Sequence, residues 1–454
     1  MKAPPGRAGV TFSPRACLRF SRVRAVGIYA VSRSGDSKMH AAAERFRFGR
    51  NVGILASGEL LSRGLTFLAF TRLARLLSLS GYGLLELAQA GMIFLTLLAD
   101  LGTGKTGTRE IAANGGTAQP ALVRAVLSMQ LLLAFAIVAL LGAFGSCLPI
   151  EPALGRLLLG FAVSLLGYPF LLGWVFQGRS QMAPIAVLQV ARRAVFLIVT
   201  MIVVRSPTDL FRVPWAEFLA VAIAATGYVV LLRSFGEPIR IGLRTRRDLG
   251  LLRESLPIGG SQLVWAGRMY LPMLVLASYS SRISIGFFGA ALRIVMVAQT
   301  LLGTYFTTLF PAISEMSSDS PIALAALLKQ SLRQVLWPLT ILAGATTLSA
   351  SAIIRLVFGG KFAEPEATSS LAVLIWILPI LAWRRHYSEA LIALHHSGEE
   401  LMCSLFGLAL LVLLTVSLSG IGVSAGAWAM LIAEFSASAL TSWRLRRHLR
   451  PREC

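Results

Sequence analysis

Seven arginines lie inside segments of the chain that are otherwise strongly apolar: Arg63, Arg192, Arg193, Arg268, Arg293, Arg384 and Arg385. A charge at the centre of a lipid bilayer costs about 2.5–3.5 kcal/mol on insertion scales, so such residues face ion partners or a water-filled cavity. The planar guanidinium can donate two hydrogen bonds at once to a phosphate. We therefore expect these residues to bind an anionic ligand, with Arg63, Arg268 and Arg293 foremost.

Acidic residues are fewer within the same segments: Glu59, Asp100, Glu217, Glu389 and Glu434, with Glu86 near a segment end. Because cations outnumber anions, pairing alone is not expected to neutralise the interior. Glu59 and Arg63 stand four residues apart, as do Arg385 and Glu389, and this spacing also suits structural ion pairs on a helix. Each of these arginines therefore has two interpretations, as a cavity residue or as half of an inert pair, and Glu59 and Glu389 are candidates for pairing or coupling.

Adjacent arginines on a helix point about 100° apart, so at most one of Arg192 and Arg193 is expected to face the centre. His386, His395 and His396 are possible proton relays. For the last two, a solvated turn beside Gly398 is the preferred interpretation.

Signals for enzyme chemistry, cofactors or metals are weak. The sequence contains no GxSxG, HExxH or dinucleotide-binding motif, and GTGK at 102–105 lacks the spacing of a phosphate-binding loop. The cysteines form neither a CxxC motif nor a His/Cys ligand cluster: Cys17, Cys147, Cys403 and Cys454. We expect no catalytic residue, no cofactor and no metal, and any uphill transport must draw on an ion gradient or a partner.

Apolar segments that each match a bilayer in length position these residues. Only 14% of the 454 residues are charged, and the mean hydropathy is +0.71. About 20 apolar residues span the hydrocarbon core, and backbone groups there must bond within a helix. The sequence thus predicts an all-α polytopic membrane protein with about twelve transmembrane helices, at 52–72, 84–104, 122–146, 155–177, 184–204, 214–233, 256–278, 285–310, 333–356, 368–392, 400–419 and 422–443.

The basic residues fall mainly between these segments, which argues against a nucleic-acid partner despite the net charge of +22. Counted from Met39 with the N-terminus inside, 20 Lys and Arg lie on the cytoplasmic side and 8 on the other. The positive-inside rule then favours an even number of spans with both termini cytoplasmic.

The chain is predicted to divide into a leader and two halves. Residues 1–38 carry eight Lys or Arg and one acid, and are either a transit peptide or, as we prefer, the product of a start assigned before Met39. Two six-helix bundles follow, at 39–233 and 256–454, joined by a basic connector at 234–255. An offset of 205 residues places Arg63 on Arg268 and Gly81 on Gly286, which suggests repeated halves.

Several stretches resemble the bacterial oligosaccharide flippases, often labelled polysaccharide biosynthesis proteins, within the multidrug/oligosaccharidyl-lipid/polysaccharide exporter superfamily. They are SRGLTFLAFTRLARLLSLSGYG (62–83), LLADLGTGKTGTREIA (97–112), WVFQGRSQM (174–182), GFFGAALRI (286–294), FPAIS (310–314) and FGGKF (358–362). Arg63 falls in the family's first-helix motif and Arg109 in its basic motif after the second helix. The run at Arg384, Arg385 and His386 and the leader depart from the family pattern.

The resemblance implies two six-helix bundles around a central cavity in the bacterial inner membrane. It also implies that an undecaprenyl-pyrophosphate-linked oligosaccharide is flipped to the periplasmic leaflet for O-antigen or exopolysaccharide assembly, with membrane lipids and a polysaccharide polymerase as partners. Arg63 would then contact the diphosphate and Arg109 would sit at the cytoplasmic mouth. A small-molecule exporter, a peptidoglycan-precursor flippase and, less favoured, a membrane-embedded glycan polymerase are the alternatives.

Overall fold

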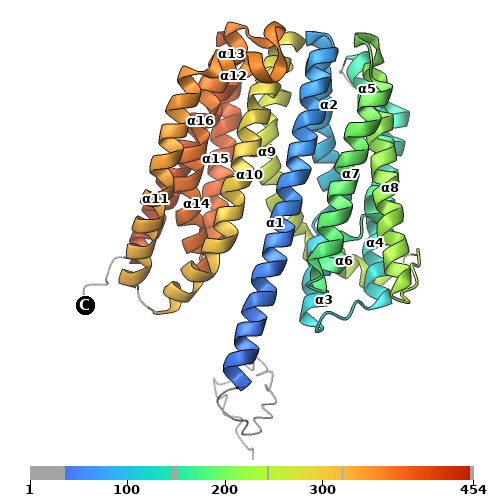
Figure 1. Ribbon diagram of the computed structural model, residues 1–454, viewed down its shortest axis with the longest axis vertical. Coiled ribbons are helices and arrows are strands. Elements are labelled where there is room, and N and C mark those ends of the chain that lie inside the picture. The colour runs from blue at the N-terminus through green and yellow to red at the C-terminus, as the bar shows by residue number, and fades with distance from the viewer. Residues whose placement is uncertain (1–35, 146–150, 243–244, 320, 450–454) are drawn as a thin grey trace, which may run out of the picture. The chain divides into compact units, whose positions relative to one another are not determined.

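The computed structural model describes residues 36–145, 151–242, 245–319 and 321–449 (Figure 1). Most of the expected leader, residues 1–35, lies outside these ranges. The chain divides into two compact units at Gly49 and Arg50, and the fold and the site described below belong to the second. The described residues form no strand, and their α-helices are α1(Asp36–Leu76), α2(Leu79–Asp100), α3(Thr103–Ala113), α4(Pro120–Phe144), α5(Pro152–Ser164), α6(Gly173–Gly178), α7(Met182–Val203), α8(Val213–Ser234), α9(Thr245–Leu276), α10(Arg282–Asp319), α11(Pro321–Leu348), α12(Ala350–Phe358), α13(Pro365–Leu374), α14(Ile377–Ala393), α15(Ser397–Ser417) and α16(Ser424–Leu449).

Many of these helices are long and apolar enough to cross a membrane. Within the described residues, eight helical stretches meet this criterion by length and composition, and a ninth does if α11 and α12, which meet at a bend of 76°, count together. Their outward faces carry large exposed apolar side chains such as Phe135, Trp215 and Ile341. Exposed apolar surface on this scale is suited to lipid.

Several predicted spans are broken. The fourth consists of α5 and α6 separated by a 3-10 turn, Tyr168–Phe170, that contains Pro169. The tenth consists of α13 and α14, which meet at Ile375 and Trp376. By contrast, Pro272 and Pro338 stay inside continuous helices. The predicted connector is partly helical, because α9 already begins at Thr245.

The turn between α2 and α3 shows how the GTGK stretch is used. Leu101 and Gly102 adopt left-handed backbone conformations, with φ of 43° and 81°. The Asp100 carboxylate accepts hydrogen bonds from the backbone amides of Gly102 at 3.0 Å and Gly104 at 3.1 Å, so it caps the free amides at the start of α3. The stretch is thus a helix-capping turn, in agreement with the sequence argument against a phosphate-binding loop.

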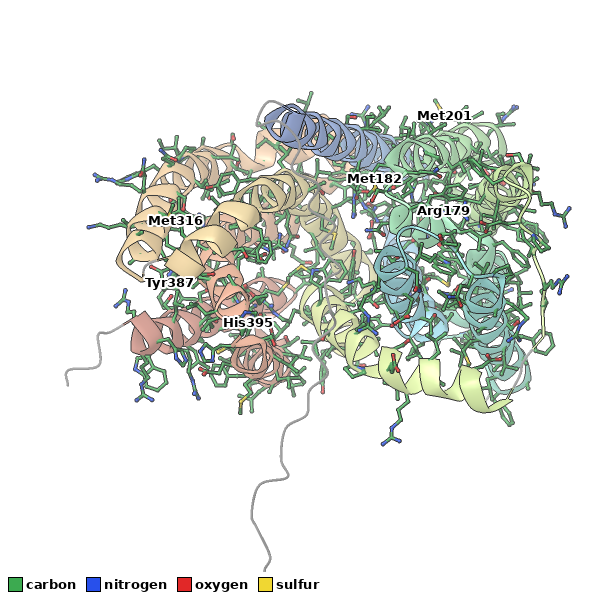
Figure 2. All side chains as sticks on the ribbon, turned by 90° about the horizontal axis from the view of Figure 1, so that it is seen from below. Arg179, Met182, Met201, Met316, Tyr387 and His395 are labelled. Carbon is green, nitrogen blue, oxygen red and sulfur yellow. The ribbon has the colours of Figure 1, made fainter. Side chains whose placement is uncertain are left out.

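Two groups of helices make up the fold. Helices α2 to α8 pack on one another, and helices α10 to α16 pack on one another, while α9 contacts α2 and α3 on one side and α15 on the other. Viewed from below, Arg179 and Met182 lie in the first group, and Tyr387 and His395 lie in the second (Figure 2). Helices α2 and α10 form the main contact between the groups.

Small residues allow that contact to be close. A Cβ atom added to Gly83 of α2 would lie 1.8 Å from the backbone oxygen of Arg282. One added to Gly286 of α10 would lie 3.2 Å from the amide nitrogen of Gly83. Glycines at such crossings let helix backbones pack directly against each other in a membrane. We call this contact the α2–α10 seam.

Candidate functional site

Two cavities lie beside α1, α9 and α10, and the smaller one is bordered by both helix groups. The large cavity has a volume of about 1080 Å³ and is lined by α1, α9, α10, α14 and α15. The small cavity has a volume of about 330 Å³ and is lined mainly by α1, α2, α7, α9 and α10. Four residues line both: Arg63, Trp265, Tyr270 and Met296. The cavities are therefore neighbours, and Arg63 stands where they meet.

Arg63 is held by its own helix but remains open to the cavities. Its Nε atom donates to Glu59 Oε1 at 2.7 Å, one helical turn earlier, as the sequence spacing suggested. Gln189 of α7 donates to the other oxygen of Glu59. Even so, 49% of the Arg63 side chain is exposed, so one face of its guanidinium is available to a ligand.

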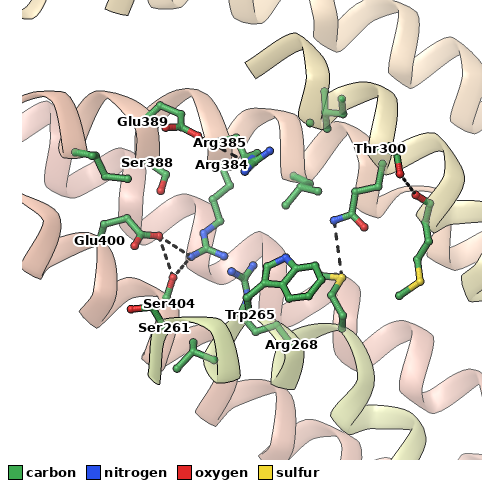
Figure 3. A pocket seen from close by; sticks show the side chains of 18 of the residues that line it. Ser261, Trp265, Arg268, Thr300, Arg384, Arg385, Ser388, Glu389, Glu400 and Ser404 are labelled. Atoms are coloured by element: carbon green, nitrogen blue, oxygen red, sulfur yellow. Dashed lines mark hydrogen bonds and ion pairs between the residues drawn. The ribbon is translucent and has the colours of Figure 1, made fainter. Parts of the chain in front are cut away.

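A buried network of charges forms one wall of the large cavity. Glu434 of α16 pairs with Arg268 of α9 and, at 3.3 Å, with Arg384 of α14. Arg384 also contacts Glu400 at 3.4 Å and donates to Ser404 Oγ at 2.6 Å (Figure 3). Only 3% of its side chain is exposed. Two arginines and two glutamates balance, so this network joins four helices and carries no net charge.

Arg385, the neighbour of Arg384, is more loosely held. Its Nε atom lies 3.9 Å from Glu389 Oε1, and its guanidinium stands 5.4 Å from the ring centre of Phe306. The Arg385 side chain is 42% exposed. Arg385 and Glu389 both line the large cavity (Figure 3), so this charged pair is accessible there.

The small cavity contains two further clusters. Arg293 of α10 contacts both oxygens of Glu86 of α2 at 2.8 Å and lies 3.4 Å from the ring centre of Phe70. Arg192 pairs with Glu217 of α8 and donates to the Tyr168 hydroxyl.

Both adjacent arginines of α7 face this cavity, although at most one was expected to do so. Arg193 Nη1 lies 3.7 Å from the second oxygen of Glu217, and its side chain is 31% exposed. One carboxylate thus serves two arginines, and Arg193 is the more weakly held.

The interior is more nearly neutral than the sequence suggested. All seven arginines contact a glutamate, and six glutamates take part: Glu59, Glu86, Glu217, Glu389, Glu400 and Glu434. Glu400 was not predicted, because its partner lies sixteen residues earlier on another helix. Trp265, which is 51% exposed beside both cavities, and Gln189, which donates to Glu59, were not predicted either. The accessible arginines are Arg63, Arg385 and Arg193.

Residues 48–317 match the family described as polysaccharide biosynthesis proteins, and this range covers more than half of the chain. The chain belongs to that family. Its match includes Arg63, Arg192, Arg268 and Arg293, and ends before Arg384 and Arg385, where the sequence departed from the family pattern.

Two curated relatives of this chain are both named "Putative O-antigen transporter". One, from Escherichia coli (strain K12), is 23% identical over 383 residues, which cover 81% of this chain and 88% of the relative. The other, from Shigella dysenteriae, is 23% identical over 253 residues. That match covers 55% of this chain and 63% of the relative, less than two thirds of its length.

Solved structures show the same fold. An inward-facing multidrug resistance MATE family transporter of the MOP superfamily superposes with a TM-score of 0.71 at 14% identity, over 85% of this chain and 94% of that one. The lipid II flippase MurJ in an inward closed conformation gives 0.72 at 13% identity, over 86% and 87%. These matches confirm the predicted class: an all-α multi-pass membrane protein with about twelve spans in two bundles around a cavity.

Other predicted residues of this polysaccharide biosynthesis protein lie away from both cavities. Arg109 of α3 is exposed and contacts Glu254 of α9 at 3.4 Å, so it joins the first helix group to α9. His386 is buried, with Nδ1 2.7 Å from the carbonyl oxygen of Ala382 and its ring against Phe306. His395 is at the end of α14 with a left-handed backbone, φ 64°.

Proposed function

We propose that this protein flips an undecaprenyl-pyrophosphate-linked oligosaccharide from the cytoplasmic to the periplasmic leaflet of the bacterial inner membrane. The cargo would serve O-antigen or exopolysaccharide assembly, with a polysaccharide polymerase acting after it. The observation that carries this proposal is the large cavity, because it adjoins the small one and presents two accessible arginines, Arg63 and Arg385. Family membership and the names of the relatives support it.

The accessible arginines bind the diphosphate in this proposal. Arg63 and Arg385 each have a carboxylate on one side and open cavity on the other, so a diphosphate can add hydrogen bonds to them without breaking a buried pair. Arg193 offers a third guanidinium from the small cavity. Arg192, Arg268, Arg293 and Arg384 are fixed in buried pairs and position the helices that carry the accessible ones.

Trp265 provides the surface for the sugar. Its indole is half exposed beside both cavities, and no hydrogen bond from the described part of the chain reaches it. The negative face of an aromatic ring attracts the weakly positive C–H groups of a sugar. An open indole beside charged groups therefore fits a headgroup that joins a sugar to a phosphate.

The transport cycle proposed is alternating access, with both termini in the cytoplasm. The structure superposes better on an inward-facing MATE transporter, with a TM-score of 0.71, and on MurJ in its inward closed conformation, with 0.72, than on an outward-facing MATE transporter, with 0.59. The α2–α10 seam would close the periplasmic side in this state and part in the next. Arg109 would lie at the cytoplasmic mouth near lipid headgroups.

Export of a small molecule is the second candidate function. The near balance of charges favours it, because the seven arginines that line the cavities contact six glutamates, five of which line the cavities too. Glu389 also reaches the large cavity with only a 3.9 Å contact to Arg385, which leaves room for a cationic ligand. Loss of drug resistance on replacing Glu389, with no change in surface glycan, would support this candidate over the first.

The test of the flippase replaces Arg63 with Ala and with Lys, and measures surface polysaccharide at equal protein levels. Hydrogen bonds to charged groups contribute about 1.5–3 kcal/mol, so R63A should lower the initial rate at which surface polysaccharide appears by about tenfold or more. R63K should recover part of the rate, because it keeps the charge and loses the bidentate geometry. R355A on α12 is the matched control, since Arg355 lines neither cavity. Wild-type glycan display by R63A, R193A and R385A alike would refute the proposal.

A further inference from the structure

A cluster of three metal-binding side chains lies outside both cavities, where the start of α15 meets the end of α16. His396 immediately precedes α15, Glu399 lies in its first turn, and His448 lies in the last turn of α16. One donor atom from each residue lies within 4.8 Å of the other two. No metal site was predicted at these residues, because His448 follows Glu399 by 49 positions and their spacing does not reveal the contact.

The two imidazoles are directed at the same carboxylate. His448 Nε2 lies 2.8 Å and His396 Nδ1 lies 3.6 Å from Glu399 Oε1. The rings stack with centres 3.8 Å apart and an angle of 20° between their planes. Only the nearer nitrogen is within hydrogen-bond distance of the oxygen, so His448 is held by a hydrogen bond, whereas His396 is held by stacking on His448 and its Nδ1 makes no hydrogen bond to Glu399.

The carboxylate has an unused acceptor. Glu399 Oε2 is shielded from solvent and accepts no hydrogen bond from the described residues, although Arg444 Nη1 lies 3.7 Å from it. Both imidazoles remain partly exposed, so an ion and a water molecule can reach them. These observations place two imidazole nitrogens and one carboxylate oxygen close together, and a turn of one of the stacked rings would let both nitrogens face a single ion.

We propose that His396, Glu399 and His448 bind one divalent transition-metal ion of the Zn²⁺ class, with water as the fourth ligand. Two imidazoles and a carboxylate are a frequent zinc-binding set, with Zn–N and Zn–O distances of about 2.0–2.2 Å. The ion would fasten the end of α16 to the turn between α14 and α15, and so stabilise the second helix group. This site is independent of the cavities and of the proposed cargo.

Arg444 gives the proposal a distinctive test. Its positive charge opposes a cation at Glu399, so removal of that charge should tighten metal binding. A role for the cluster in packing alone makes no such prediction. The side chain is partly exposed and can swing away when an ion binds.

The experiment measures Zn²⁺ binding by calorimetry on the full-length protein in detergent, purified without a histidine tag. The wild type should bind one ion, H396A and H448Q should bind at least about tenfold more weakly, and R444Q should bind more tightly. H448Q keeps a hydrogen-bond donor to Glu399, so it separates metal binding from packing. H395N is the matched control: the neighbouring histidine lies outside the cluster, and Asn tolerates its left-handed backbone.

Thermal unfolding provides the second measurement. Zn²⁺ should raise the midpoint of the wild type and H395N by about 2 °C or more, and leave H448Q unchanged. Absence of binding in the wild type would overturn the proposal. Equal affinity in the wild type, H396A and H448Q would also overturn it, because the ion would then bind elsewhere.

Discussion

At the scale of the residue, one carboxylate can form ion pairs with two arginines, and this organises the buried charges. Glu434 is buried and contacts both Arg268 and Arg384, while Glu400 and Ser404 also contact Arg384. Burying charges is costly, and removing one partner of a buried pair costs about 3–5 kcal/mol. Glu434 therefore links α16 to α9 and α14, and Arg384 extends the network to α15.

Replacing Glu434 with Gln should consequently destabilise the protein by about 3–5 kcal/mol, since two buried guanidinium groups lose their shared counter-charge. E389Q is the matched control, because Glu389 lies 3.9 Å from a half-exposed arginine and should cost less than about 1 kcal/mol. Thermal unfolding of both variants in the same detergent measures the difference. Equal losses would show that Glu434 does not carry the network.

The residue scale also shows what sequence can and cannot predict. The pairs Glu59–Arg63 and Arg385–Glu389 were foreseen, because both members lie on one helix and their spacing determines their contact. The pairs Arg293–Glu86 and Arg268–Glu434 join residues 207 and 166 positions apart. Helix packing determines those pairs, and no local spacing encodes it. These pairs between distant residues neutralise most of the positive charge that the sequence led us to expect.

At the scale of the element, the apolar segments were predictable because lipid imposes both their length and their helical state. The breaks were harder to foresee. Pro169 lies in a 3-10 turn between two helices, whereas Pro272 and Pro338 leave their helices continuous, so the same residue type had different effects. A neighbouring helix can satisfy the backbone groups that proline frees, and sequence alone does not show where this happens.

The α2–α10 seam yields a prediction about an element. G83A should lower the unfolding midpoint and weaken closure, since the added Cβ would meet the backbone oxygen of Arg282 at 1.8 Å and force the two helices apart. G142A in α4 is the control, because nothing lies within 4 Å of its added Cβ. There Ala should leave the stability unchanged or raise it by about 0.5–1 kcal/mol, given its higher helix propensity. Equal midpoints for both variants would contradict the seam's role.

At the scale of the whole molecule, the two helix groups contact each other through helices that the 205-residue offset aligns. The 205-residue offset aligns Tyr82 with Phe287, and both rings pack on Phe362, with ring centres 5.3 Å and 5.8 Å away. The aligned helices α2 and α10 thus form the seam together. Contact between equivalent elements of two repeats is a common basis of alternating access in secondary transporters. The seam is accordingly the place where the proposed cycle must open.

A reciprocal pair of caps spans the same end of the molecule. Arg75 Nε, near the end of α1, donates to the carbonyl oxygen of Val357 in α12 at 3.0 Å. Lys361 Nζ, after α12, donates to the carbonyl oxygen of Arg75 at 3.1 Å and to that of Leu77. Carbonyl groups at the end of α1 thus accept a hydrogen bond from Lys361, and one at the end of α12 accepts from Arg75. These contacts stabilise the conformation of this structure, in which the two helix ends are together.

Replacing Arg75 and Lys361 together with Met should therefore shift the proposed cycle toward its outward-facing state. The measurement uses M296C in a chain whose native cysteines are replaced, because Met296 lines both cavities. A membrane-impermeant maleimide applied from the periplasmic side should label it several times faster in the double variant. R355M is the control, since it removes a cation from α12 and leaves both caps in place. Unchanged labelling in the double variant would mean that the caps stabilise α1 and α12 without controlling access to the cavities.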